Sequence, residues 1–308
     1  MDYFIYILTN IMLPIFLVIL AGAVLSRRVN LDVKNMTKLQ MNLLIPVMLF
    51  TKIYDSDLEA SLVLMVTIIT SLAIGVSYVL SFVLSKILRF TKQETSVFMN
   101  TASFFNSGNF SLPLMNLLYS NPLAVSIQAI IMLVQSILLF TTGVYVAGAG
   151  RRSSLDTLKY IFKMPLIYAI VTAFVLKNLN INIYHPVKES LNLIALGYST
   201  IAIITLGAQL GKIQIRFSNY KIFLSNFIRL IVGPLIALIF VMLFGISGLA
   251  AQVLIIALGA PTAVNVVLTS IELDNEPEFA SQAVFSSTLL ASITMSFVIF
   301  MVFKYIPV

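Results

Sequence analysis

Long apolar runs separated by short polar segments make up most of the 308-residue chain. A helix of about 20 apolar residues is long enough to cross the hydrocarbon core of a bilayer. Runs of about this length recur at residues 4–25, 34–52, 61–85, 95–119, 122–147, 157–177, 189–211, 220–245, 248–271 and 279–303. The pattern therefore predicts an all-α polytopic membrane protein with ten transmembrane helices.

Two of these runs, the fourth and the ninth, contain residues that interrupt helices. The fourth includes Phe105 to Leu114 (FNSGNFSLPL), and the ninth includes Leu258 to Asn265 (LGAPTAVN). Each combines glycine, proline and side-chain amides at a depth where unsatisfied backbone groups are costly unless they line a cavity or are buried in protein. Interrupted segments at matching places in two halves are typical of secondary transporters, in which they form the binding site.

The spacing of prolines indicates that the two halves of the chain are repeats. Pro113 and Pro261, in the two interrupted runs, are 148 residues apart. Pro14 and Pro165, in the first and sixth runs, are 151 residues apart. Two pairs in like-numbered runs at nearly equal spacing favour an internal duplication.

A division in the polar loop after the fifth run gives two repeats, residues 1–148 and 149–308, with five spans each. Because five is an odd number, the second repeat enters the membrane from the opposite face, so the repeats are inverted. We expect the broken helices four and nine to face each other near the middle of the bilayer.

Composition agrees with this fold class and excludes several kinds of function. Hydrophobic residues make up 59% of the chain and charged residues 10%, against about 45–50% and 25% in soluble domains. There is no cysteine, and the single histidine, His185, falls in a predicted loop. A disulfide framework and thiolate chemistry are therefore excluded, and no catalytic residue or metal site is predicted.

The net charge of +7 reflects orientation in the membrane and not a nucleic-acid partner. With an external N-terminus, basic residues gather in the loops that face the cytoplasm, the bias that orients membrane proteins. Those loops contain Arg27, Arg28, Lys34, Lys38, Lys86, Arg89, Lys92, Arg151, Arg152, Lys159, Lys163, Lys212, Arg216 and Lys221, and the opposite side contains Lys52, Lys177, Lys188 and Lys304. We expect a multi-pass protein of the cell membrane with both termini outside.

The first run also resembles a secretory signal, because Ala21-Gly22-Ala23 could serve as a cleavage site. The run begins with Asp2 in place of a basic residue and is long for a signal sequence. We therefore expect a retained first helix.

The interrupted helices supply the chemistry of a candidate site. A half-helix that starts at a break presents free N–H groups and a partial positive charge, which favour a carboxylate or another anion. The residues expected to bind substrate are Asn106, Ser107, Gly108, Asn109, Pro113, Ala260, Pro261, Thr262 and Asn265. The alternative is that each proline only kinks a packed helix and that the asparagines join neighbouring spans.

Other polar residues in the runs are few. No aspartate or glutamate lies inside a predicted span, although proton-coupled carriers usually depend on one; we expect Glu94 and Glu272, at span ends, to be solvated. Arg229, the deepest charge, is expected to extend to the cytoplasmic interface, with a role as substrate counter-ion as the alternative. The amides expected to join helices or to line the pathway are Gln128, Gln135 and Gln209.

Motifs spread over almost the whole chain resemble those of the auxin efflux carrier family. Residues 106–114 are similar to the family's fourth-span signature, in which an asparagine precedes a Pro-Leu pair by seven residues, and residues 260–265 are similar to its ninth-span crossover. Residues 39–50, 205–210 and 287–290 resemble its second, seventh and tenth spans. The chain lacks the long cytoplasmic loop of the plant exporters, so it resembles the compact prokaryotic branch, which includes proposed carriers of malonate and other carboxylates.

The resemblance implies a fold related to sodium/bile-acid symporters and sodium/proton antiporters. It also implies a scaffold of spans 1, 2, 6 and 7 that forms a homodimer, and a transport domain of spans 3–5 and 8–10. By the resemblance, Asn106, Pro113 and Pro261 contact the substrate and Asn265 lies beside them, whereas the role of Asn109 rests on the chemistry of the break alone. The acidic and basic pair near the second span of the plant exporters has no evident match.

These observations predict a secondary transporter that exports small organic anions, mono- or dicarboxylates, by elevator-type alternation. An inside-negative potential favours export, because one exported negative charge releases about 2.3 kcal/mol per 100 mV. The alternative is a sodium-coupled anion symporter of the bile-acid type, with carbonyls and amides at the crossing as sodium ligands; no other cofactor is expected. A membrane enzyme would need a catalytic constellation and a receptor would not need paired broken helices, so neither is predicted.

Overall fold

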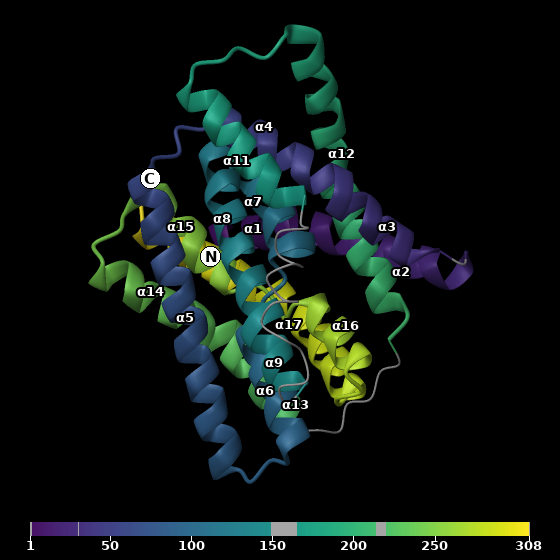
Figure 1. Cartoon of the computed structure of the whole chain (residues 1–308). Helices are drawn as coiled ribbons and strands as arrows, with labels where there is room; N and C mark the ends of the chain where they lie inside the picture. Colours follow the sequence, from purple (N-terminus) through teal and green to yellow (C-terminus); the bar gives the residue numbers. More distant parts are fainter. Residues whose placement is uncertain (1, 30, 149–164, 214–219, 308) are drawn as a thin grey trace.

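The computed structural model describes residues 2–29, 31–148, 165–213 and 220–307, and every regular element in these ranges is a helix (Figure 1). The predicted all-α class is therefore confirmed for this part of the chain. In chain order, with π-helical segments marked η, the elements are α1 Asp2–Ile7, η1 Leu8–Met12, α2 Leu13–Arg28, α3 Val33–Leu39, η2 Gln40–Leu44, α4 Ile45–Asp55, α5 Ala60–Ile87, α6 Lys92–Ser103, η3 Ser107–Ser111, α7 Leu112–Leu118, α8 Pro122–Leu138, η4 Leu139–Gly143, α9 Val144–Ala147, α11 Pro165–Asn178, α12 His185–Gly211, α13 Tyr220–Phe227, η5 Ile228–Val232, α14 Gly233–Leu243, α15 Gly248–Leu258, α16 Val264–Glu272 and α17 Pro277–Tyr305.

Six of the described helices are long and apolar enough to cross a membrane. They are Tyr3–Arg28, Ala60–Ile87, Pro122–Ala147, His185–Gly211, Tyr220–Leu243 and Pro277–Tyr305. The shorter apolar helices α11 and α15 belong to the predicted sixth and ninth spans, and the start of the sixth, residues 157–164, lies outside the described residues. The predicted fourth and ninth spans are each divided between two short helices, so length alone does not identify them.

Prolines explain why most of the π-helical turns occur where they do. Pro14, Pro46, Pro113 and Pro234 each occupy the second position of the α-helix that follows η1, η2, η3 or η5. Proline has no N–H group, and its ring displaces the carbonyl four residues earlier. The preceding turn therefore widens into a π-bulge, which bends the helix without ending it.

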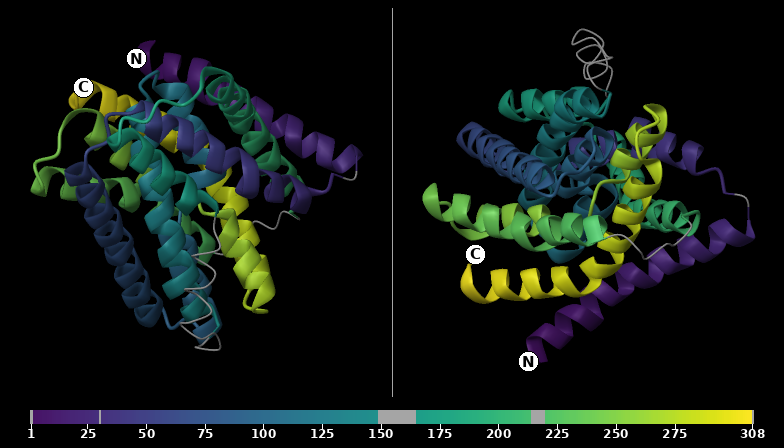
Figure 2. Two further views of the ribbon diagram at one scale, coloured as in Figure 1. Left: turned by 45° about the horizontal axis from the view of Figure 1, so that its top comes forward. Right: turned by 90° about the horizontal axis from the view of Figure 1, so that it is seen from below.

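The two ends of the chain lie on the same side of the molecule (Figure 2). Near the N-terminus, the ring of Phe4 packs edge-on against Phe300 of α17, with centroids 6.0 Å apart. The ring of Tyr3 lies 6.3 Å from that of Phe300. Ends on one side require an even number of membrane crossings.

Helix ends that carry basic residues gather on the other side. Arg27, at the end of α2, donates from Nε to the carbonyl of Gly211 at the end of α12, over 3.0 Å. Lys221, near the start of α13, forms an ion pair with Glu94 near the start of α6. Glu94 also closes a capping box with Thr91, so it is paired rather than simply solvated.

Glycines allow α2 and α12 to pack backbone against backbone. A Cβ atom on Gly22 would collide with the carbonyl oxygen of Ile204, and one on Gly207 would collide with that of Ile19. Small residues are enriched at such interfaces in membranes because close van der Waals packing replaces the hydrophobic effect between helices. Helix α4 packs against α12, and α11 packs against α4.

Gly207→Ala is expected to destabilise the protein by about 1–3 kcal/mol, the usual cost of an extra methyl group in a packed interface. The matched control is Gly197→Ala on the same helix, where a Cβ atom meets nothing within 4 Å and alanine is the better helix former. Melting temperatures in detergent check this result. Equal melting temperatures for the two variants would argue against the close backbone contact.

Candidate functional site

The two interrupted helices meet at their breaks. Helices α6 and α15 end there, and η3 and α16 begin there. The extended residues in between pair as an antiparallel bridge: the amide of Asn106 donates to the carbonyl of Pro261 over 2.7 Å, and the amide of Ala263 donates to that of Phe104 over 3.0 Å. Each break thus supplies hydrogen-bond partners that the other needs inside a bilayer.

Arg229 joins the C-terminal ends of α6 and α15, the half-helices that precede the two breaks. Its side chain is 1% exposed, and its guanidinium donates to the carbonyls of Ser103 (2.7 Å) and Ala102 (3.4 Å) of α6 and to that of Leu258 of α15. The guanidinium also lies over the ring of Phe105, 5.1 Å from its centroid. A helix C-terminus carries about half a negative charge, so one guanidinium balances both ends.

The expectation that Arg229 extends to the cytoplasmic interface is therefore wrong. The two breaks leave carbonyls without helical partners, and these carbonyls replace water as acceptors for the guanidinium. Gly233, one turn later, makes room for the contact, because a Cβ atom there would collide with both the Arg229 guanidinium and the Leu258 carbonyl oxygen.

Side chains from α8 and α12 hold the start of η3. Gln135 donates to the carbonyl of Phe105, and Gln128, two turns earlier on α8, donates to another carbonyl of the break over 3.4 Å. The hydroxyl of Tyr198 on α12 donates to the carbonyl of Gly108 over 2.7 Å. Two of the glutamines expected to join helices thus support the break itself.

The half-helices that follow the breaks begin at η3 and at α16. Their starts lie at one cavity and have hydrogen-bond donors available. Asn106 caps η3, since its Oδ1 accepts a hydrogen bond from the amide of Asn109 over 3.1 Å. The Nδ2 of Asn106 is buried and has no partner among the described residues. Helix α16 begins at Val264, and its N-cap residue, Ala263, provides no side-chain cap; the first N–H groups of a helix have no intrahelical partner. Both starts carry partial positive charge, so together they favour an anion.

A small cavity of about 50 Å³ lies at these two helix starts. The predicted site residues that line it are Asn106, Ser107, Gly108, Asn109 and Asn265. Its remaining polar lining residues include Thr37 of α3, Gln40 of η2, Gln135 and Ser136 of α8, and Gln209 of α12. Small-molecule pockets usually measure about 300–1,000 Å³, so the walls must separate to admit a larger carboxylate.

The other predicted site residues lie behind the cavity. Pro113, Ala260, Pro261 and Thr262 are buried and are not among the residues that line it. The hydroxyl of Thr262 donates to the carbonyl of Thr101 over 3.0 Å. In this structure, Thr262 therefore holds the two broken helices together.

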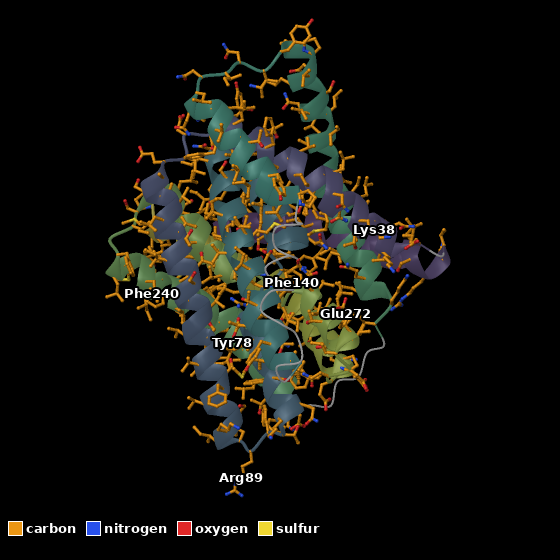
Figure 3. The ribbon with its side chains drawn as sticks, in the orientation of Figure 1. Lys38, Tyr78, Arg89, Phe140, Phe240 and Glu272 are labelled. Carbon is orange, nitrogen blue, oxygen red and sulfur yellow. The ribbon has the colours of Figure 1, made fainter. Side chains whose placement is uncertain are left out.

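A larger cavity, of about 860 Å³, leads from the crossing toward the side that carries the basic helix ends. Residues common to the walls of both cavities are Thr37, Gln209 and Val264. The charged residues that line the larger cavity are Lys34, Lys38, Lys212, Glu272 and Glu278. Figure 3 labels Lys38 on α3 and Glu272 at the end of α16, on this side of the molecule. The crossing is thus approached from the basic side.

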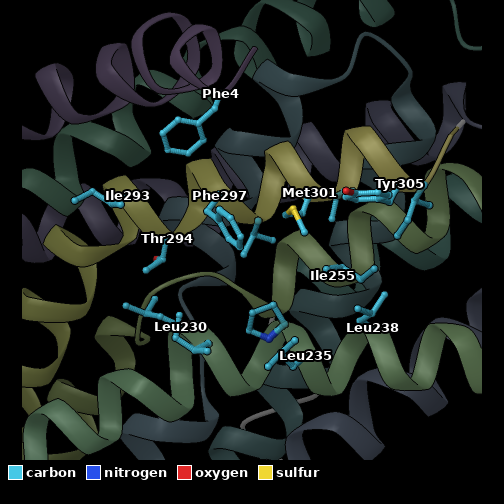
Figure 4. A pocket seen from close by; sticks show the side chains of 15 residues that line it. Phe4, Leu230, Leu235, Leu238, Ile255, Ile293, Thr294, Phe297, Met301 and Tyr305 are labelled. Atoms are coloured by element: carbon cyan, nitrogen blue, oxygen red, sulfur yellow. The ribbon is translucent and has the colours of Figure 1, made fainter. Parts of the chain in front are cut away.

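An apolar groove of about 700 Å³ lies between α1, α14 and α17 (Figure 4). Aromatic and aliphatic side chains such as Phe4, Leu235 and Phe297 line it. Thr294 also lines it, and its hydroxyl donates to the carbonyl of Leu290 over 3.2 Å. A carboxylate in this groove would lose its hydration without gaining donors, so the crossing is the better anion site.

Four polar contributors to the site, one of which is the cavity-lining Ser136, were not expected from the sequence. Thr37 and Gln40 form part of the cavity wall, and Tyr198 holds the Gly108 carbonyl. A polar pair three residues apart in an apolar helix lies on one face, and that spacing was the available signal for Thr37 and Gln40. Tyr198, an amphipathic residue in an apolar run, offered no comparable signal.

Comparison with known proteins gives one match that covers most of the chain. The sequence model of a family described as membrane transport protein matches residues 7–299. No individually curated protein matches the sequence.

Proposed function

We propose a cargo and a mechanism for this chain, which belongs to the auxin efflux carrier family of membrane transport proteins. Membership confirms the resemblance of its motifs and makes the chain a multi-pass membrane transporter. The proposed cargo is a small organic anion, a mono- or dicarboxylate. The proposed mechanism is export across the cell membrane by elevator-type alternating access.

The distribution of partial charge at the crossing supports this proposal. Arg229 balances the helix ends on one side of the crossing, whereas the helix starts lie at the cavity. Asn106, whose buried Nδ2 has no partner among the described residues, lines that cavity. Among the described residues, no carboxylate side chain lines that cavity. A bound carboxylate would therefore accept charge-assisted hydrogen bonds, each contributing about 1.5–3 kcal/mol.

The proposed topology has ten spans in two inverted repeats. It is supported by the position of both chain ends on one side and of the basic helix ends on the other. The boundary between the repeats, together with Arg151, Arg152, Lys159 and Lys163, falls at residues 149–164, outside the described residues.

The proposed scaffold contains α1 to α4, α11 and α12, with η1 and η2, and forms a homodimer. The proposed transport domain contains α5 to α9 and α13 to α17, with the crossing. The cavity supports this division because Asn106 and Asn265 stand on one wall and Thr37, Gln40 and Gln209 on the other. Sliding of one wall past the other would open the site to each face in turn. The Tyr198–Gly108 hydrogen bond joins the two bodies and must break in each cycle.

The test is a thermal-shift screen of the purified protein with pyruvate, lactate, benzoate, malonate and succinate. We expect at least one of these anions to raise the melting temperature, because a ligand that binds only the folded state stabilises it. Labelled counterflow of that anion in liposomes, in sodium and in choline buffers, should then proceed equally well. Sodium-dependent counterflow would favour the bile-acid type of symport instead. No shift and no counterflow with any of the five would contradict anion transport.

Single cysteines introduced at Asp2 and Pro307 are expected to react with an impermeant maleimide from outside intact cells. A cysteine at Arg89, at the far end of α5 (Figure 3), should react only after permeabilisation. The native chain contains no cysteine, so the protein itself gives no background labelling. Labelling of Asp2 and Pro307 from opposite sides would rule out an even number of spans.

A further inference from the structure

The guanidinium of Arg229 is a fixed positive charge inside the membrane-spanning part of the protein. Its side chain is 1% exposed, and its polar partners among the described residues are backbone carbonyls of α6 and α15. A guanidinium is not deprotonated in proteins, and a carbonyl group carries no net charge. The charge is therefore stabilised by its neighbours but not cancelled.

Acidic side chains do not cancel it either. Glu94, the acid at the start of α6, pairs with Lys221 on the basic side, so this pair adds no net charge. None of the predicted spans has an aspartate or glutamate in its interior. With an empty cavity, the body that contains the crossing thus holds one net positive charge within the membrane.

We propose that Arg229 is the counter-charge that travels with the bound anion, an inference that rests on the proposed anion transport. Phe105 links the charge to the cargo site, because its ring lies over the guanidinium and also lines the cavity. With a monoanion bound, the moving body is electrically neutral. When empty, it returns with one positive charge.

The sign of the voltage dependence follows from this charge count. During export, the loaded body moves outward without net charge and the empty body moves inward with one positive charge. An inside-negative potential therefore accelerates only the return step, and a charge that crosses the whole potential shifts the distribution of the empty body by up to about 50-fold per 100 mV. Exchange of one monoanion for another uses only the loaded body, so it is insensitive to voltage.

The test measures exchange and net export separately in liposomes whose potential is set by potassium and valinomycin. The probe is radiolabelled pyruvate or malonate, whichever the thermal-shift screen identifies. For pyruvate and the wild-type protein, exchange should be equal with and without an inside-negative potential, whereas net export should increase. For malonate, a dianion, the loaded body carries one negative charge, so exchange should slow when the potential is applied.

Two substitutions separate the charge from the hydrogen bonds. Arg229→Gln retains amide donors for the carbonyls but removes the charge. The loaded body and the empty body should then each carry one positive charge less when they move across the membrane. Pyruvate exchange should then become voltage-sensitive, the empty return should become insensitive, and affinity should fall by on the order of tenfold. Arg229→Lys keeps the charge and should keep the wild-type pattern. Size-exclusion profiles confirm that both variants fold.

Voltage-sensitive pyruvate exchange in the wild type, or identical voltage patterns in the wild type and Arg229→Gln, would overturn the inference. Voltage-insensitive malonate exchange in the wild type would do the same. If Arg229→Gln fails to fold, the voltage dependence of exchange and of net export in the wild type still tests the inference. Absence of binding and exchange in the wild type is a different outcome, because it would overturn anion transport itself.

Discussion

Asn106→Ala is expected to lower anion affinity by roughly ten- to a hundredfold and so to abolish saturable transport, while the protein still folds. The change removes the unpartnered Nδ2 donor of Asn106, a residue that lines the cavity, and one hydrogen bond to a charged ligand contributes about 1.5–3 kcal/mol. It also removes the cap on η3, at a cost of about 1 kcal/mol. The amide of Asn106 keeps its bond to the Pro261 carbonyl, so the crossing should persist.

Matched substitutions separate binding from structure. Asn265→Ala, on the other half-helix, should cause a similar loss of affinity because Asn265 lines the same cavity. Asn42→Ala should have no effect on binding, since Asn42 is exposed and its amide donates to the Lys38 carbonyl over 2.9 Å. Affinities come from thermal shifts and counterflow with the anion that the screen identifies, and folding from size-exclusion profiles. Wild-type affinity in both cavity variants would mean that the anion binds elsewhere.

Gln135→Ala is expected to be more harmful than a change in an amide that only joins two helices, for which bilayer measurements average about 0.6 kcal/mol. Gln135 donates to the Phe105 carbonyl within the break and lines the cavity. Its removal deletes one of two hydrogen bonds to this buried carbonyl, which also accepts from the amide of Ser107, at a cost of about 0.5–1.5 kcal/mol.

Gly233→Ala is expected to destabilise the protein by about 3 kcal/mol or more and to eliminate transport. The added methyl group would collide with the Arg229 guanidinium and with the Leu258 carbonyl oxygen that it binds. Overpacking alone costs about 1–3 kcal/mol, and loss of partners for a buried charge adds to that cost. The damage should therefore exceed that of an ordinary glycine replacement in a helix.

The control for this prediction is Gly75→Ala in the middle of α5, where a Cβ atom meets nothing within 4 Å. Alanine there should leave the melting temperature unchanged or raise it slightly, because alanine favours helix more than glycine does. Melting temperature and anion counterflow are measured for both variants. A Gly233→Ala protein as stable as Gly75→Ala would show that the guanidinium tolerates displacement from the helix ends.

The helix breaks were predictable from the sequence because their causes are local. Pro113 and Pro261 remove backbone donors, and neighbouring glycines and asparagines allow the chain to leave helical geometry. The structure places breaks in both predicted segments and brings them into contact. The first break, residues 104–106, falls seven to nine residues before Pro113, and the chain re-enters a helix before that proline. The second break, residues 259–263, contains Pro261.

The partners of Arg229 were not predictable in the same way. They are backbone carbonyls 126 and 29 residues away along the chain, and a carbonyl has no sequence signature. Hydropathy therefore favoured an interfacial position for this side chain, whereas the folded chain provides acceptors at the crossing. The size of the cavity was equally hidden, because it depends on the distance between two packed groups of helices.

Because the two ends of the chain lie in contact, the order of the helices along the chain can be changed without changing their arrangement in space. The rings of Phe4 and Phe300 are 6.0 Å apart, so a short linker between the ends would close the chain into a ring. New ends are best tolerated at exposed turns, such as the one at Gly245 between α14 and α15, where the backbone adopts a φ of +65°. A circular permutant opened there would retain every contact of the crossing, although the half-helices would be synthesised in a different order.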